Sequence, residues 1–366
     1  MIKFIDTAAE SAYFKDQFIA KIKKVVDRSD FILGEDVSLF ENKFAAFAGS
    51  LHAVSCASGT DAIYLALRAV GIKPGQEVVT TPFTFMATAS AILRAGAVPV
   101  FADITPSGLN IDPASVKTRM NRKTGAILAV HIFGLPADMD GLMELSDKFG
   151  VPLIEDCAQS FGSSYGGKPC GSMGKAGCFS FFPTKNLGGA GDGGMVVTGD
   201  AGISAAIRVL RAHGKNTKGE FCVDGINSRL DTLQAALLLV KLKEAGKLIK
   251  MRRELFALYR EELSGLVEFQ EPSEGAVPVP NQCVVMTDGR DGLKKHLAER
   301  KIMTAVYYDR PLYSHPVFKK RGYRDDCPAA SRVCGRVLSL PFYPLLTVKD
   351  AEKVISEIKK YFKGRK

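Results

Sequence analysis

The sequence predicts an α/β protein in which helices flank a mainly parallel β-sheet. Up to about residue 200, short apolar runs alternate with longer segments whose apolar residues recur at helical spacing. This alternation is typical of βαβ units, which place parallel strands side by side. The length of 366 residues also favours one large domain with a smaller companion.

Seven strands are expected in the first part of the chain, each a short apolar run bounded by turn residues. They are His52–Cys56, a strand from Glu77, Val98–Ala102, Ala126–Phe133, Val151–Asp156, Cys178–Phe182 and Met195–Val197. Helical periodicity predicts helices at 14–26, 39–47, 58–70, 84–95 and 139–149. The third of these begins with the capping residues Ser58, Thr60 and Asp61 and stops at Gly71, which is typical of a capped helix.

The second part of the chain is predicted to be richer in helices. Expected helices are 201–212, a long one capped by Asn227 and Ser228 that reaches Val240, then 247–263, 291–300, 329–336 and 348–362. A strand at Cys283–Met286, the segment 304–308 and a turn at Leu338-Ser-Leu-Pro lie among them. We therefore predict a large domain over 1–246, with an N-terminal helix, and a small α+β domain over 247–366.

Composition narrows the class of protein. No apolar run reaches the ~20 residues of a membrane span, and the first residues lack the apolar core of a signal peptide, so a cytoplasmic protein is expected. The eight cysteines include no Cys-x-x-Cys pair and the five histidines are dispersed. This pattern indicates reduced, mostly buried thiols and no metal site.

The net charge of +10 is compatible with nucleic acid or with an acidic small substrate. The basic clusters 319–324 and 359–366 are interpreted as solvent-exposed surface, and no nucleic-acid-binding motif accompanies them. Nucleic-acid binding is therefore not expected. A Gly-x-Gly-x-x-Gly motif between strand and helix is absent, as is a phosphate-binding Gly-x-x-x-x-Gly-Lys loop. A nicotinamide-dependent sugar reductase therefore loses its main support.

The Gly-rich stretch 178–197 contains the most informative residue, Lys185. It follows an apolar strand and precedes five glycines between Gly188 and Gly194, which places the amine at the edge of the sheet. Desolvation there would lower the pKa of the amine and free it as a nucleophile for Schiff-base chemistry. The alternative is a lysine that extends from a surface loop into water.

Asp156 ends an apolar run 29 residues before Lys185. Because ligands of open α/β sheets bind at the carboxyl ends of the strands, the two side chains are expected to face one crevice. Pyridoxal phosphate requires a carboxylate beside its pyridine nitrogen and a lysine that forms an imine. The pair therefore predicts a pyridoxal phosphate site.

Three motifs together extend this prediction. Ile-Glu-Asp-Cys-Ala-Gln-Ser-Phe-Gly at 154–162, Ser-Phe-Phe-Pro-Thr-Lys-Asn-Leu-Gly at 180–188 and Gly-Asp-Gly-Gly at 191–194 resemble the pyridoxal-phosphate-dependent nucleotide-sugar aminotransferases of the DegT/DnrJ/StrS type. The resemblance begins near Phe31 and continues almost to the end of the chain. It implies PLP fold type I, with a mostly parallel seven-stranded sheet, a smaller C-terminal domain and a homodimer with the cofactor at the interface.

The resemblance also implies roles for single residues. Lys185 would bind the cofactor as a Schiff base and move the proton between the cofactor and the substrate carbon, and Asp156 would keep the pyridine nitrogen protonated. The other implied cofactor contacts are Phe85 stacked on the ring, Gln159 near the 3′-oxygen, Gly59, Thr60 and Ser180 at the phosphate, and Asn227 from the neighbouring subunit. For Phe85 the alternative is a core residue, and for Gly59 and Thr60 an ordinary helix start.

Substrate contacts are implied less directly. Arg229 would contact an acidic substrate, or else pair with Asp231. Tyr307 and Tyr308 stand where many relatives have His-Tyr, and the nearby stretch 281–288 lacks an expected aromatic residue. Both departures border the sugar site, so they bear on the identity of the sugar.

The implied reaction moves an amino group, from L-glutamate, onto a nucleotide-linked keto-sugar. Gly225–Ala236 and the Lys185 motif best match relatives that aminate UDP-2-acetamido-3-keto-glucuronate for surface polysaccharide such as lipopolysaccharide O-antigen. The alternatives are an aminotransferase for a 4-keto-6-deoxy nucleotide sugar, a sugar dehydratase, and a non-catalytic regulatory protein on the same fold. The dehydratase would have replaced Lys185, and the non-catalytic protein would have lost Lys185 or Asp156.

Overall fold

A seven-stranded sheet forms the centre of the protein in the computed structural model, which describes residues 1–324 and 326–364. The strands are β1 (His52–Cys56), β2 (Glu77–Thr80), β3 (Val98–Phe101), β4 (Thr124–Val130), β5 (Leu153–Asp156), β8 (Ala176–Ser180) and β9 (Gly194–Thr198). Their order is β1-β9-β8-β5-β4-β2-β3, and β9 alone runs antiparallel to both of its neighbours. The predicted mostly parallel seven-stranded sheet is therefore confirmed.

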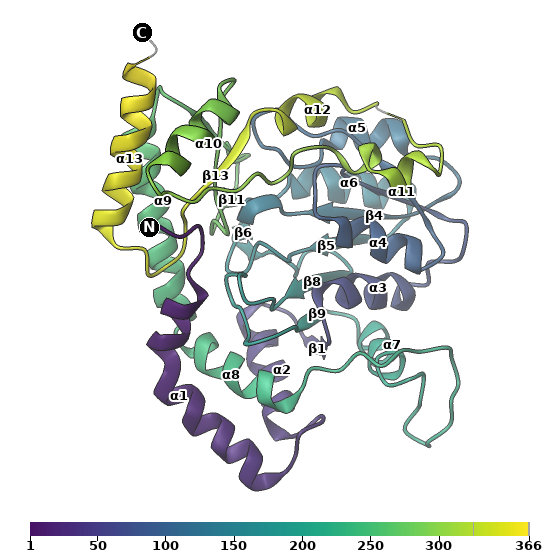
Figure 1. Ribbon diagram of the computed structural model, residues 1–366. Coiled ribbons are helices and arrows are strands. Elements are labelled where there is room, and N and C mark those ends of the chain that lie inside the picture. The colour runs from purple at the N-terminus through teal and green to yellow at the C-terminus, as the bar shows by residue number, and fades with distance from the viewer. Residues whose placement is uncertain (325, 365–366) are drawn as a thin grey trace.

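Helices cover both faces of this sheet (Figure 1). On one face α3 (Gly59–Ala69), α4 (Met86–Arg94) and α7 (Ala201–Leu210) pack over Leu128 and Ile154. On the other lie α2 (Glu35–Phe47), α8 (Thr232–Lys243), α5 (Pro113–Arg119) and α6 (Met139–Phe149). Because both faces are buried, β4 is apolar at successive positions rather than at alternate ones.

The C-terminal part of the chain builds a second core, at the upper left of Figure 1. It contains the antiparallel sheet β10-β12-β13, with β10 (Glu268–Phe269), β12 (Cys283–Met286) and β13 (Val337–Leu340). Its helices are α9 (Ala245–Leu263), α10 (Arg290–Glu299) and α13 (Val348–Lys363). The division of the chain at residue 246 remains a prediction, and α9 begins one residue before it.

The N-terminal residues join the two parts. Ile2 pairs with Ile302 and is buried in the C-terminal core. The next element is α1 (Thr7–Arg28), which packs against α8. Its Phe14 contacts Val240 of α8 and Leu248 of α9. This segment therefore contacts the C-terminal core first and the helices of the large sheet next.

Two sequence predictions are wrong. Leu338-Ser-Leu-Pro is not a turn, because its first three residues belong to β13, which pairs antiparallel with β12 and is completely buried. The long helix does not begin at Asn227 but at Thr232, with Asp231 at its N-cap. The expected caps serve tertiary contacts instead: Asn227 forms a bridge with Ala212, and the Ser228 hydroxyl contacts the start of α3.

The remaining elements are short. They are β6 (Ser164–Tyr165), β7 (Lys168–Pro169) and β11 (Ala276–Val277) in a small sheet, the helices α11 (Pro316–Lys319) and α12 (Pro328–Cys334), and the 3₁₀ helices Ile132–Gly134 and Leu312–Ser314. Of the described cysteines, Cys222 alone is exposed. None of the described helices is long and apolar enough to span a membrane. The last two residues of the basic cluster 359–366 lie outside the described residues.

Candidate active site

A cavity of about 390 Å³ opens where β4, β5 and β8 end and where α3 and α4 begin. Most of the site residues predicted from the sequence line it: Gly59, Thr60, Phe85, Asp156, Gln159, Ser180, Lys185, Tyr307 and Tyr308. Asn227 and Arg229 do not belong to its lining. The cavity lies at the carboxyl ends of parallel strands, where open α/β sheets bind their ligands.

Lys185 lies in the loop after β8, and its backbone N–H donates to the carbonyl of Phe182. Within the described part of the chain, its Nζ makes no hydrogen bond or ion pair. Burial lowers the pKa of Lys185 to about 8, although the nearby Asp156 carboxylate acts in the opposite direction. A substantial fraction of this amine is therefore neutral, and hence nucleophilic, near neutral pH.

The pKa of Lys185 predicts how its reactivity depends on pH. Only the neutral amine reacts with acylating reagents, so modification of Lys185 in cofactor-free enzyme should rise with pH and level off above about 8. An ordinary exposed lysine has roughly 1 amine in 300 neutral at pH 8. Trace acetic anhydride labelling, read by peptide mass spectrometry, measures this profile. A tenfold rise per pH unit that continues to pH 10 would contradict the lowered pKa.

Asp156 is the last residue of β5 and is 4% exposed. The Thr88 hydroxyl of α4 donates to its Oδ2 at 2.9 Å, and the Ala158 N–H donates to its Oδ1 at 3.1 Å. Burial raises the pKa of Asp156, while these hydrogen bonds and Lys185 favour the ionised form. The carboxylate is thus oriented toward the cavity by two fixed donors. Thr88 was not singled out from the sequence, and its hydroxyl also lies 2.9 Å from that of Thr84, just before the helix.

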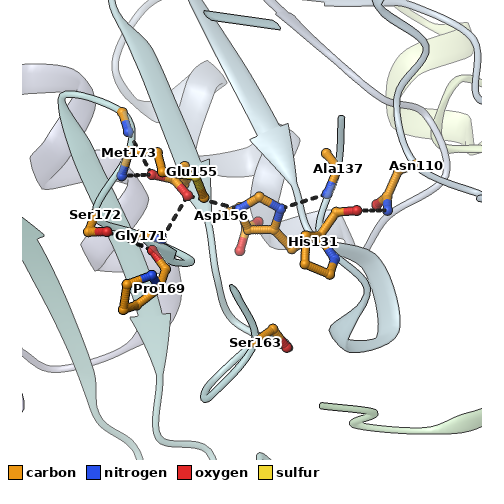
Figure 2. Close-up of polar contacts among 12 residues, drawn as sticks. Asn110, His131, Ala137, Glu155, Asp156, Ser163, Pro169, Gly171, Ser172 and Met173 are labelled. Atoms are coloured by element: carbon orange, nitrogen blue, oxygen red, sulfur yellow. Dashed lines mark hydrogen bonds and ion pairs between the residues drawn. The ribbon is translucent and has the colours of Figure 1, made fainter. Parts of the chain in front are cut away.

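Behind Asp156 lies a fully buried pair, His131 and Glu155, which the sequence analysis also missed. Figure 2 shows the His131 ring between the Glu155 carboxylate and the backbone of Ala137. The Ala137 N–H donates to Nδ1 at 3.0 Å, so the ring carries its proton on Nε2, which lies 3.0 Å from Glu155 Oε2. The backbone N–H of His131 also donates a hydrogen bond to the backbone carbonyl of Asp156.

Three further donors complete the hydrogen bonding of Glu155: the backbone N–H groups of Gly171, Met173 and Gly174. His131, Glu155 and Cys157 bring possible metal ligands within 4.8 Å of one another. Because N–H donors already surround the carboxylate and occupy Nδ1, we assign the group a structural role. It fixes the end of β5, and with it the backbone that carries Asp156.

The start of α3 forms a concave, N–H-lined corner of the cavity. Ser58 caps the helix by accepting from the Asp61 N–H, and the amides of Gly59 and Thr60 have no acceptor within the helix. A Cβ on Gly59 would lie 2.7 Å from Cβ of Ser180, so a glycine is required for this approach. Free amides and the positive end of a helix suit a phosphate group.

Aromatic and amide side chains form the opposite walls. Phe85 is 61% exposed, so it is not a core residue, and its ring borders the cavity. Gln159 accepts a 2.6 Å hydrogen bond from the Phe133 N–H and donates to the Tyr308 hydroxyl at 3.4 Å. Burial raises the pKa of Tyr308, which therefore stays protonated at neutral pH.

Asn227 and Arg229 lie on the extended segment before α8. Asn227 is exposed, and Arg229 is partly buried. Among the described residues, Arg229 forms no ion pair, so the pairing with Asp231 is not seen. Neither residue reaches the cavity of its own chain.

These features fit pyridoxal phosphate. An unpaired amine with a lowered pKa, a buried carboxylate, an N–H-lined helix start and an exposed phenyl ring surround one cavity at the carboxyl ends of a parallel sheet. When bound, the cofactor supplies an aldehyde for the amine and a ring that absorbs carbanion charge. Fold and cavity together define a pyridoxal-phosphate-dependent enzyme of fold type I.

Comparison with known proteins identifies the family. Residues 13–359 match the model of the DegT/DnrJ/EryC1/StrS aminotransferase family, and the chain belongs to it. It is 40% identical to the UDP-N-acetyl-3-dehydro-alpha-D-glucosamine 3-aminotransferase of Acidithiobacillus ferrooxidans, over 99% of this chain and 98% of that protein. It is 38% identical to the UDP-2-acetamido-2-deoxy-3-oxo-D-glucuronate aminotransferase of Pseudomonas aeruginosa, over 94% and 96%. The crystal structure of DesV from S. venezuelae superimposes with a TM-score of 0.96 at 36% identity, over 98% of both chains.

The family assignment settles the class of reaction. The protein is a pyridoxal-phosphate-dependent sugar aminotransferase. The predictions of enzyme class, cofactor and fold are therefore confirmed, and the nicotinamide reductase is excluded. The roles assigned to single residues stay predictions, which the structure makes specific enough to test.

Proposed function

We propose that this enzyme aminates C3 of a UDP-linked 2-acetamido-3-keto sugar, with L-glutamate as the amino donor. The observation that carries the proposal is the similarity to two relatives over almost the whole chain, since both of their names specify a UDP-linked, 2-acetamido, 3-keto hexose. They differ at C6, which is a hydroxymethyl group in one sugar and a carboxylate in the other. The uronate is our first candidate, and surface polysaccharide such as lipopolysaccharide O-antigen is its expected destination.

In this reaction the chain's own residues hold the reactants and move one proton. Lys185 is the base that removes a proton from the donor carbon and returns one to the sugar carbon, a role that its lowered pKa favours. Asp156 orients the cofactor ring and keeps a negative charge beside it. One cavity takes each substrate in turn, which predicts ping-pong kinetics.

We further propose a homodimer in which Asn227 and Arg229 complete the partner's site. Both lie outside the cavity of their own chain, on a segment whose neighbours expose large apolar side chains: Phe31, Ile32, Leu33, Phe221 and Val223. Ile32 pairs with Asp231, so Phe31, Ile32 and Leu33 share one surface with the segment 227–231. Contiguous exposed apolar residues beside an incomplete site favour a second copy as the occupant.

Mixing two inactive variants should restore activity if Asn227 acts across the interface. In a mixed dimer of Lys185→Ala and Asn227→Asp chains, one of the two sites has both native residues. Random pairing after joint refolding makes half of the dimers mixed, so about a quarter of wild-type activity is expected. Steady-state turnover measures the recovery, and each variant refolded alone is the control. No recovery, with mixed dimers demonstrated by differential tagging, would place Asn227 in its own subunit's site.

Arg229 is expected to distinguish the sugar with a carboxylate at C6 from the sugar with a hydroxymethyl group there. A planar guanidinium that binds a carboxylate through two hydrogen bonds supplies about 2 to 3 kcal/mol in a partly buried site. Arg229→Leu should therefore lower kcat/KM for the 3-keto-glucuronate by roughly 30- to 150-fold, and hardly change kcat/KM for the neutral 3-keto-glucosamine. Arg229→Lys should recover only part of the loss, because an ammonium offers no paired donors.

The experiment that tests the proposed function is a substrate panel with pyridoxamine-loaded enzyme. The panel contains both UDP-linked 3-keto sugars and a 4-keto-6-deoxy sugar. The readout is the return of the yellow colour when the pyridoxamine form of the cofactor gives its amino group to the sugar. Arg122→Leu, which changes an exposed residue far from the cavity, is the matched control for Arg229→Leu. The second candidate is the 4-keto-6-deoxy sugar, because Tyr307 lines the cavity where many relatives have His. Preference for that sugar would overturn the 3-keto proposal, and equal losses on charged and neutral sugars would remove Arg229 from carboxylate binding.

A further inference from the structure

Gln282 lines the cavity but has no role in the predicted cofactor site. It precedes β12, on the wall that the C-terminal part of the chain contributes. Its Oε1 accepts a 2.9 Å hydrogen bond from the hydroxyl of Ser339. Because this contact fixes the amide oxygen, the amide NH₂ is the group left for a ligand, and it has no partner among the described residues.

Ser339 fixes more than this amide. It is completely buried in β13, where it lies opposite Val284 of β12. Its backbone also exchanges two hydrogen bonds with Ala305, two residues before Tyr307. One buried serine thus ties together the two segments that line this wall, Gln282 on one side and Tyr307-Tyr308 on the other.

The chemistry of the cavity lining limits what this wall recognises. Of the described residues that line the cavity, Lys185 is the only cation, while Asp156 and Asp192 are anions. Lys185 and Asp156 lie beside the predicted cofactor position. Polar recognition of the substrate by this chain therefore depends on neutral donors, and Gln282 is a neutral donor held in one orientation.

We infer that Gln282 is a specificity-determining residue whose amide donates a hydrogen bond to a ring or substituent oxygen of the sugar, with Ser339 as its positioning residue. The inference rests on the proposed function, since it needs a nucleotide sugar in this cavity. It assigns Gln282 to the sugar and not to the amino donor, and because the two substrates occupy the site in turn, the two half-reactions test this assignment separately. A purely structural glutamine would affect both half-reactions equally.

The two half-reactions can be measured separately on the complete enzyme. Loss of the yellow colour with L-glutamate reports the donor half-reaction, and loss of colour with the stable UDP-linked 3-amino sugar reports the sugar half-reaction in reverse. The variants are Gln282→Leu, which removes the donor at similar size, Gln282→Glu, which replaces it with a charge, and Ser339→Ala, which frees the amide. Gln17→Leu, an exposed position on α1, is the matched control.

Gln282→Leu should lower kcat/KM of the sugar half-reaction by roughly 5- to 150-fold and leave the glutamate half-reaction within about twofold. Ser339→Ala should show the same selectivity with a smaller loss, since the amide remains but is no longer oriented. Gln282→Glu should lose more with the uronate than with the neutral sugar, because its carboxylate repels another. Equal loss in both half-reactions, or no loss in the sugar half-reaction, overturns the inference.

Failure of the inference and failure of the proposed function give different results. If wild-type enzyme accepts neither 3-keto sugar nor its amino product, the proposed function fails, and the same variants are then measured with the nucleotide sugar that it does accept. If wild-type enzyme converts a 3-keto sugar and Gln282→Leu converts it equally well, the inference alone fails.

Discussion

Replacing Lys185 with Ala is expected to abolish amino-group transfer. The variant loses the only amine among the described residues that line the cavity, and with it the predicted covalent attachment of the cofactor and the predicted base that moves the substrate proton. The proton transfer alone accounts for roughly 10²- to 10⁴-fold in rate. Lys185→Arg should be equally inactive, because a guanidinium does not give up its proton to become a nucleophile.

Borohydride treatment gives this prediction a readout besides activity. Reduction should fix the cofactor covalently on wild-type enzyme, at the peptide that contains Lys185, and on neither variant. A normal circular dichroism spectrum and melting temperature would show that the variants fold. Full turnover by Lys185→Ala would end the assignment of Lys185 as the catalytic amine.

The second large effect is expected for Asp156→Asn. The substitution keeps the shape of the side chain: the amide oxygen can still accept from the Ala158 N–H, and the amide NH₂ can donate to the oxygen of the Thr88 hydroxyl. It removes the charge that is predicted to keep the ring nitrogen protonated, so the ring should absorb carbanion charge less well. Turnover should fall by about 100-fold or more, which corresponds to ~3 kcal/mol in the barrier, while the cofactor remains bound.

Single-turnover kinetics and the visible spectrum measure this effect independently of substrate binding. Asp147→Asn, which changes an exposed carboxylate near the end of α6, is the matched control. A rate within threefold of wild type in Asp156→Asn would show that another group is the partner of the ring.

Local patterns were sufficient for much of the fold. The strands of the large sheet are apolar on both faces, so each appears in the sequence as a short continuous run, and their alternation with helices indicates a parallel sheet. Lys185 and Asp156 could be predicted because Asp156 ends one such strand and Lys185 follows another, and the carboxyl ends of neighbouring strands meet at one edge.

The missed features depend on distant partners. Val337–Leu340 is a strand because β12 lies beside it, and four apolar and small residues before a proline do not reveal that neighbour. Asn227 and Ser228 have good capping side chains, but contacts with Ala212 and the start of α3 hold them in an extended segment. Glu155 lies in the motif 154–162 but received no role from the sequence, because its four hydrogen-bond partners lie on loops that the sequence does not place.

The pairing of Ile2 with Ile302 bears on the order in which the protein acquires its structure during synthesis. The βαβ units of the large sheet have their contacts close together in sequence, so they can form while translation continues. Ile2 stays unpaired during synthesis until residues 301–303 have left the ribosome, because those residues form its backbone hydrogen bonds. Ser339, which holds Gln282, is later in the chain still, so the wall that contains Gln282 can form only after the strands on either side of Lys185 have emerged.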